Sequence, residues 1–168
     1  MLGQKRALLE TLQPVHYTAP CPLVGNATIG QHLRHSLDHY ARCLAAAEAA
    51  TPTVIQYDRR ERGTAVESDV GEARREVERL IKAVESLPDA ALAAPVSAAF
   101  VLSAGGEGEA QPMASTLGRE LGFVTHHAIH HHALIKTMAG ALGVDVGGIA
   151  DFGMAPSTAH YRKTTEQQ

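Results

Sequence analysis

The 168-residue sequence contains no tryptophan, three phenylalanines, four tyrosines and only two cysteines. Cys21 and Cys43 are too few and too far apart for a CxxC motif or a disulfide framework, so a reducing, cytoplasmic compartment is expected. No apolar run reaches eighteen residues, which argues against a membrane partner, and residues 1–14 lack the continuous apolar core of a signal peptide. With 15 basic and 18 acidic residues the net charge is −3, so no nucleic-acid partner is expected.

Histidine, in contrast, is abundant: the chain has ten histidines against only seven aromatic residues of the other three types. Five lie between His126 and His132, and three more lie between His32 and His39. The remaining composition, 45% hydrophobic and 20% charged, is typical of an ordinary globular domain. Any function that the sequence encodes visibly is therefore expected at these two groups of histidines.

Apolar residues at helical spacing predict four helices, separated by segments rich in proline, glycine and polar residues. Thr28 and Gln31 form a capping box at the start of the second helix. The expected helices cover about residues 1–12, 28–50, 68–87 and 116–142.

Alternating apolar residues over 95–102 predict a short strand, which returns at 110–114 after a glycine-rich turn at 105–108. Residues 55–63 are expected to form a polar loop. The fold class is therefore all-α, a four-helix bundle with a small β-hairpin inserted before the last long helix. A single domain over 1–168 is expected, with a core of about residues 1–143 and a docking tail at 144–168.

The fourth predicted helix places two histidines on its apolar, inward face. On a helical wheel, His127 and His131 lie one turn apart, on the same stripe as Glu120. Two imidazoles at this spacing can reach one metal ion from adjacent turns. His126 and His130 form an overlapping pair with the same spacing that points more to the side, and this second frame stays open.

The second predicted helix must supply a further ligand, because two imidazoles are too few for tight metal binding. His32, His35 and His39 lie within about 60° on the wheel, and one of them would complete a three-histidine site with open positions. His35 lies nearly opposite the helix's apolar stripe, so spacing alone selects none of the three. Asp38, Glu120 and His39 are candidates to orient a ligand by hydrogen bonding. The competing interpretation is a metal-free bundle with core histidines.

Several segments together resemble the DinB-like (DinB/YfiT) superfamily of four-helix-bundle metalloproteins, namely residues 28–39, 57–62, 115–116, 119–121, 123 and 127–131. The resemblance implies a divalent metal held by three histidines, one on the second helix and two on the fourth. Matched by position, and using Ile135 to place the pair, these are His35, His127 and His131. Zinc, nickel or iron would suit such ligands.

The superfamily includes thiol-dependent S-transferases, but the resemblance implies a fold and a metal rather than a substrate. The first hypothesis is a metal-dependent hydrolase or thiol S-transferase acting on a small molecule or thiol. The alternative is a non-enzymatic, dimeric, stress-related module with a structural metal. In the first interpretation, Tyr57, Arg59 and Arg62 belong to a loop that pairs with an anionic substrate; the plainer interpretation is a solvated loop. A homodimer is expected, with Ile129 as a candidate contact, and Cys43 is expected to be an inert buried thiol rather than a ligand.

Overall fold

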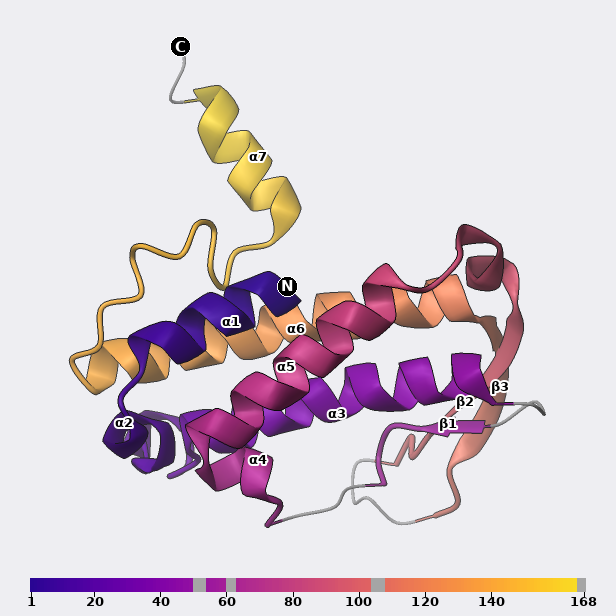
Figure 1. Ribbon diagram of the computed structural model, residues 1–168, viewed down its shortest axis with the longest axis horizontal. Coiled ribbons are helices and arrows are strands. Elements are labelled where there is room, and N and C mark those ends of the chain that lie inside the picture. The colour runs from indigo at the N-terminus through magenta and orange to yellow at the C-terminus, as the bar shows by residue number, and fades with distance from the viewer. Residues whose placement is uncertain (50–53, 60–62, 104–107, 166–168) are drawn as a thin grey trace.

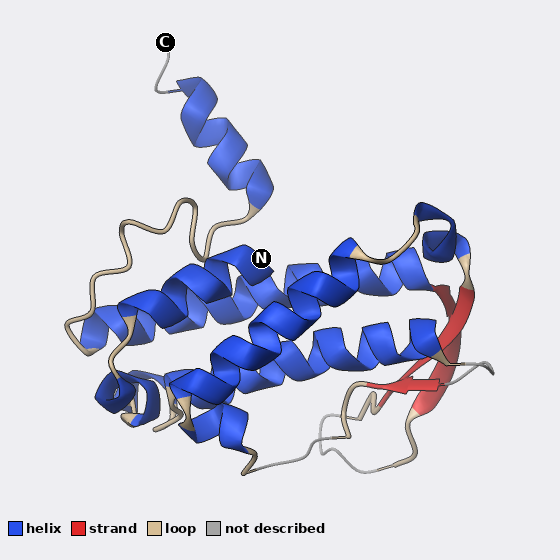
Figure 2. Ribbon diagram, viewed as in Figure 1, coloured by secondary structure: helices blue, strands red, loops and turns tan. Residues whose placement is uncertain are grey.

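The computed structural model describes residues 1–49, 54–59, 63–103 and 108–165. Helices predominate, and a small sheet closes one end of the molecule (Figure 2). In chain order the elements are α1 (Leu2–Thr11), α2 (Pro14–Thr18), η1 (Pro22–Val24), α3 (Ile29–Glu48), β1 (Val54–Gln56), α4 (Ala65–Ser68), α5 (Val70–Glu85), η2 (Asp89–Ala93), β2 (Pro95–Phe100), β3 (Gln111–Thr116), α6 (Leu117–Ala141) and α7 (Pro156–Thr165).

The four long helices α1, α3, α5 and α6 form the bundle (Figure 1). Helix α3 packs against both α5 and α6, and α1 packs against α5. The core consists of apolar side chains that each helix turns inward, such as Leu8, Leu33, Leu80 and Ile135, all fully buried. Their burial stabilises helices that would be marginal in isolation. The predicted bundle is confirmed, and its four long helices lie within the predicted ranges.

Side-chain caps set where the two histidine-bearing helices begin. Thr28 accepts a hydrogen bond from the backbone N–H of Gln31, and the Gln31 side chain accepts one from the N–H of Thr28, which completes the predicted capping box. Thr116 caps α6 by accepting a bond from the N–H of Arg119. Each cap satisfies backbone N–H groups at a defined residue, so it defines where the helix begins. The start of the helix in turn decides on which turn each histidine lies.

The sheet has the order β1–β2–β3. Strands β2 and β3 pair antiparallel and form the predicted hairpin, although residues 105–107 of its expected turn lie outside the described residues. The prediction of a loop over 55–63 is wrong at its beginning, because β1 pairs parallel with β2. Only Ile55 of β1 is buried, and one inward residue in a three-residue strand is too short a pattern to detect.

The chain after α6 packs one aromatic side chain against the bundle and then forms a helix that the sequence analysis did not predict. Gly143, at φ +72°, follows α6. The Phe152 side chain is buried, and its ring stacks on the His132 ring at 4.7 Å between centroids. Helix α7 then leaves the body of the bundle (Figure 1), and Ala159 is its one buried residue. Within the described ranges, every helix is too short or too polar to cross a membrane.

A buried lysine connects α1 to both histidine-bearing helices. Lys5 Nζ donates a hydrogen bond to Ser36 Oγ and lies 2.9 Å from His132 Nε2, and all three side chains are fully buried. Burial lowers the pKa of Lys5 to about 7. It also lowers the pKa of His132 to about 2, with a further contribution from Lys5. Both groups are therefore largely neutral in weakly alkaline solution.

The stability of the metal-free protein should consequently rise with pH between about 7.5 and 8.5. In this range the unfolded lysine, with a pKa of 10.5, keeps a proton that the folded amine releases, so alkali favours folding. The free energy of unfolding should increase by up to about 1.4 kcal/mol per pH unit. Urea denaturation of wild type, Lys5→Met and a control at the exposed Lys82, Lys82→Met, measures this slope. Parallel pH profiles for wild type and Lys5→Met would contradict the prediction.

Candidate metal centre

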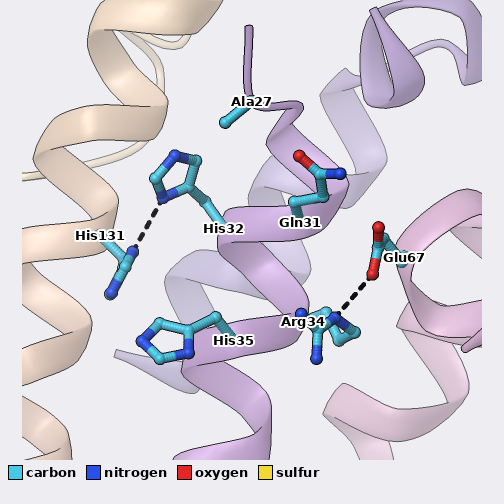
Figure 3. Close-up of a pocket in the computed structure, with 7 residues that line it drawn as sticks. All are labelled: Ala27, Gln31, His32, Arg34, His35, Glu67 and His131. Carbon is cyan, nitrogen blue, oxygen red and sulfur yellow. Dashed lines mark hydrogen bonds and ion pairs between the residues drawn. The ribbon is translucent and has the colours of Figure 1, made fainter. Parts of the chain in front are cut away.

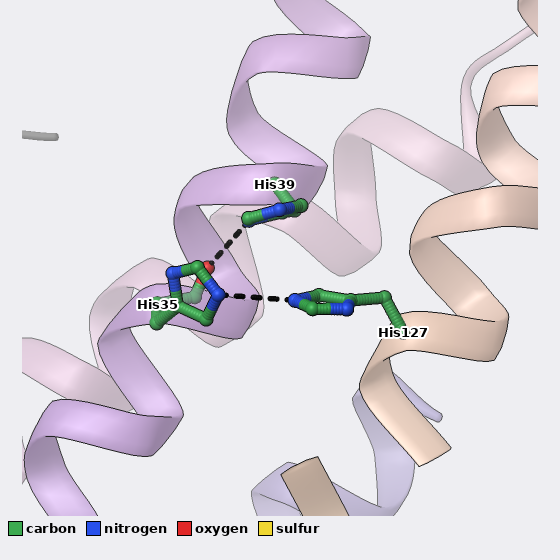
Figure 4. A group of neighbouring side chains, drawn as sticks. All are labelled: His35, His39 and His127. Carbon is green, nitrogen blue, oxygen red and sulfur yellow. Dashed lines mark hydrogen bonds between the residues drawn. The ribbon is translucent and has the colours of Figure 1, made fainter. Parts of the chain in front are cut away.

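The three histidines predicted as metal ligands lie together where α3 faces α6. Nε2 of His127 on α6 is 3.0 Å from Nε2 of His35 on α3 (Figure 4). One turn further along α6, Nε2 of His131 is also 3.0 Å from Nε2 of His127. The ring centroids of His35 and His131 are 4.7 Å apart.

A fourth imidazole, that of His39, joins this group. Ring nitrogens of His35, His39 and His127 all lie within 4.8 Å of one another, so these three residues could hold a metal ion. Since a carbonyl oxygen only accepts, the 2.9 Å contact from His39 Nδ1 to the backbone oxygen of His35 places the proton on Nδ1 (Figure 4). With the proton on Nδ1, the ring's other nitrogen, Nε2, carries the lone pair, which is the tautomer in which a histidine binds a metal through Nε2.

The spacing of His35 and His39 is a signal that could have identified the second of them as a ligand. They stand four residues apart on α3, as His127 and His131 do on α6, and their ring centroids are 4.5 Å apart. The sequence analysis assigned His39 only to orienting a ligand. In the structure its imidazole is stacked on that of His127, with centroids 4.4 Å apart.

The chemistry of the donors fits a divalent cation. Burial, reinforced by His127, His35, His32 and His130, lowers the pKa of His131 to about 2. Its ring is therefore neutral near pH 7, which is the form that binds metal. Two nitrogens that each bind the same zinc ion at about 2.1 Å can be at most about 4.2 Å apart. Both 3.0 Å separations fall within that limit.

At most one of these two contacts can be a well-directed hydrogen bond between rings. A ring nitrogen has either one in-plane hydrogen or one in-plane lone pair, so it makes a single well-directed hydrogen bond. His127 Nε2 nevertheless has two other Nε2 atoms at 3.0 Å, those of His35 and His131. A cation among three converging lone pairs would satisfy all three nitrogens.

A cavity of about 390 Å³ adjoins the histidines, between α3, α4 and α6 (Figure 3). His32, His35 and His131 line one side of it, and Arg34 and Glu67 line another. Arg34 is itself buried, and its Nε lies 2.9 Å from a carboxylate oxygen of Glu67. Side chains that are candidate metal ligands therefore form part of the wall of a space large enough for a small molecule.

Two of the predicted orienting residues, Asp38 and Glu120, take part in hydrogen bonds outside the histidine group. Asp38 accepts a hydrogen bond from Arg34 at 2.8 Å. Within the described chain, Glu120 bonds Tyr57, Ser115 and Arg119 rather than a histidine. Burial alone would raise the pKa of the Glu120 carboxyl, but hydrogen bonds from Ser115, Arg119 and Tyr57 outweigh it and lower the pKa.

Tyr57, predicted to lie on a substrate loop, is buried against the histidine group. Its side chain is only 3% exposed, and its ring stacks on that of His39 with centroids 5.0 Å apart. Its hydroxyl donates to Glu120, so the Tyr57 side chain contacts both Glu120 and His39. Arg59 is exposed and lines a separate pocket with Arg42, while Arg62 lies outside the described residues.

Other candidates from the sequence are accounted for as follows. Burial raises the pKa of the Cys43 thiol to about 12, which keeps it protonated and disfavours its use as a thiolate ligand. Ile129 is only 9% exposed, so it does not offer the surface contact that was suggested for a dimer. His126 and His130 are exposed on α6, outside the group of converging nitrogens.

Comparison with known proteins identifies the family of this chain. A protein of Rhizopus delemar named FK506-binding protein 5 is 34% identical over 111 residues, which make up 66% of this chain. The matched segment covers 28% of that relative, so the chain corresponds to less than a third of its length. The sequence profile of the DinB superfamily matches residues 4–135, which include most of α1, all of α3 and α5, and the histidines of α6. The chain therefore belongs to the DinB superfamily.

Proposed function

We propose that this protein is a divalent-metal-dependent enzyme, a hydrolase or thiol S-transferase that acts on a small molecule. His35, His127 and His131 would hold the metal, with His39 as a fourth ligand or in place of His131. The observation that carries the proposal is the convergence of two Nε2 atoms on His127 Nε2, both at 3.0 Å, of which at most one can make a well-directed hydrogen bond to it. Zinc, nickel and iron remain the candidate ions.

The cavity beside the histidines supports a catalytic rather than a purely structural centre. A structural site is closed by protein ligands, whereas a catalytic site keeps a position open to substrate. His35 and His131 each belong both to the converging group and to the cavity wall (Figure 3). A metal bound at such a site acts as a Lewis acid, or lowers the pKa of a coordinated water or thiol.

The chain's own side chains suit a polar substrate. The Gln31 amide offers both a donor and an acceptor at the cavity wall. Arg34 is held in place by Glu67 and Asp38, so its guanidinium is fixed rather than mobile. We propose that a small molecule with polar groups, or a thiol cosubstrate, occupies this cavity and is positioned by these side chains.

Metal content tests the proposal directly. Protein purified without a nickel column, and analysed for zinc, nickel and iron, is expected to contain about one ion per chain. Chelator-treated protein should take up one ion again in a calorimetric titration. Near-zero content together with no uptake would overturn the metal site.

Thermal unfolding before and after chelation separates the catalytic proposal from a structural metal. An open site in a bundle with its own apolar core predicts a modest loss of stability on metal removal. A structural metal contributes folding energy directly, so unfolding of the chelated protein at room temperature would favour the non-enzymatic alternative.

A further inference from the structure

His32 stands beside the candidate centre without belonging to its converging nitrogens. It lies three residues before His35 on α3 and also lines the cavity (Figure 3). Its Nδ1 is 3.0 Å from Nδ1 of His131, and the two ring centroids are 5.3 Å apart. His131 thus has a different neighbour at each ring nitrogen, His127 at Nε2 and His32 at Nδ1.

The direction of the contact between His32 and His131 follows from the role of His131. A neutral imidazole carries one proton, and the nitrogen that binds a metal must be the other one. If Nε2 of His131 faces the metal, its proton sits on Nδ1 and points at His32. Nδ1 of His32 must then accept this hydrogen bond, which places the proton of His32 on its own Nε2.

We propose that His32 is a positioning residue of the metal centre: its Nδ1 accepts the Nδ1–H of His131 and holds Nε2 of His131 toward the ion. This inference rests on the proposed function. Metal-bound histidines usually donate their second N–H to a carboxylate, a backbone carbonyl or water. Here a second imidazole has that role, and because His32 also lines the cavity, it connects the cavity wall to a ligand.

Two substitutions at residue 32 separate the hydrogen bond from the packing. Leucine fills similar space but accepts no hydrogen bond, whereas asparagine has its amide oxygen attached to Cγ, the same position that Nδ1 has in histidine. Zinc titration of the chelated protein should show affinity about 10–100-fold weaker in His32→Leu. His32→Asn should stay close to wild type. The matched control is His130→Leu, which removes an exposed histidine next to His131 and should leave zinc affinity unchanged.

A spectroscopic measurement on the unaltered protein tests the same point without relying on a variant that must fold. Long-range proton–nitrogen NMR of the histidine rings in zinc-loaded wild type should show His131 protonated at Nδ1 and His32 at Nε2. A proton on Nε2 of His131, or equal zinc affinity in wild type and His32→Leu, would overturn the role of His32. Absence of zinc binding by wild type would instead overturn the proposed function, and this inference with it.

Discussion

Replacing His127 with alanine is expected to weaken zinc binding about 100-fold or more, beyond the cost of losing an outer hydrogen-bond partner. His127 is central because its Nε2 is 3.0 Å from Nε2 of both His35 and His131, and its ring also stacks on His39. Its removal would leave only His35 and His131 of the three predicted ligands, which are too few for tight binding. Calorimetric titration of the chelated protein with zinc measures the loss, and His35→Ala should cause a loss of similar size.

His126→Ala is the matched control, since it makes the same change on the neighbouring residue of the same helix. His126 is exposed, so the variant should bind zinc as wild type does. Full binding by His127→Ala together with a loss in His126→Ala would show that the other frame of the histidine run is the correct one. His39→Ala in the same series asks whether the centre has a fourth imidazole ligand; an unchanged zinc affinity would restrict it to three.

Replacing Glu120 with leucine is expected to destabilise the protein by about 3–5 kcal/mol. The carboxylate is fully buried and accepts hydrogen bonds from the Tyr57 hydroxyl at 2.9 Å and from the Ser115 hydroxyl at 2.6 Å. Leucine would leave both hydroxyls buried without their acceptor. Because the Tyr57 ring stacks on His39, zinc affinity should fall as well. Urea denaturation of the metal-free protein measures the first effect separately from the second.

Arg119→Ala provides the control for this experiment. Its guanidinium lies 2.7 Å from Glu120, but the side chain is 61% exposed, so solvent screens the ion pair. Its loss should cost less than about 1 kcal/mol. A larger loss from Arg119→Ala than from Glu120→Leu would contradict the assignment of Glu120's stabilising role to its buried hydroxyl partners.

The pH dependence of the Glu120 contribution has a definite sign. Its pKa in the folded protein is lowered from the usual 4.5, so the folded state favours the ionised form. The stability that it contributes is therefore complete above pH 4.5 and is lost as the pH falls through the folded pKa. Glu120→Gln should lose less stability than wild type between pH 5 and pH 3, measured as the difference between their urea midpoints.

The long helices could be predicted because their determinants are local. Apolar residues recur at helical spacing in each of them, and Thr28 and Gln31 specify the start of α3 without help from the rest of the chain. The HxxxH pair was equally visible, since residues one turn apart share a face of any helix. By contrast, β1 has only three residues, which is too short for a periodic pattern. Its pairing with β2 is also non-local, so the sequence did not predict this strand.

The sequence by itself therefore determined the four long helices and, while the frame of His126 and His130 stayed open, it indicated that His127 and His131 share the inward face of α6. Only the tertiary structure decided which side chains of α3 meet that pair. The helical wheel placed His35 almost opposite the apolar stripe of α3. In the structure α3 packs against other elements on more than one side, so its polar flank, with Ser36 and His39, is buried as well. Which flank of a helix faces a partner depends on how the helices pack together. That arrangement comes from contacts between residues far apart in the chain, so spacing along a single helix could not reveal the positions of His32 and Tyr57.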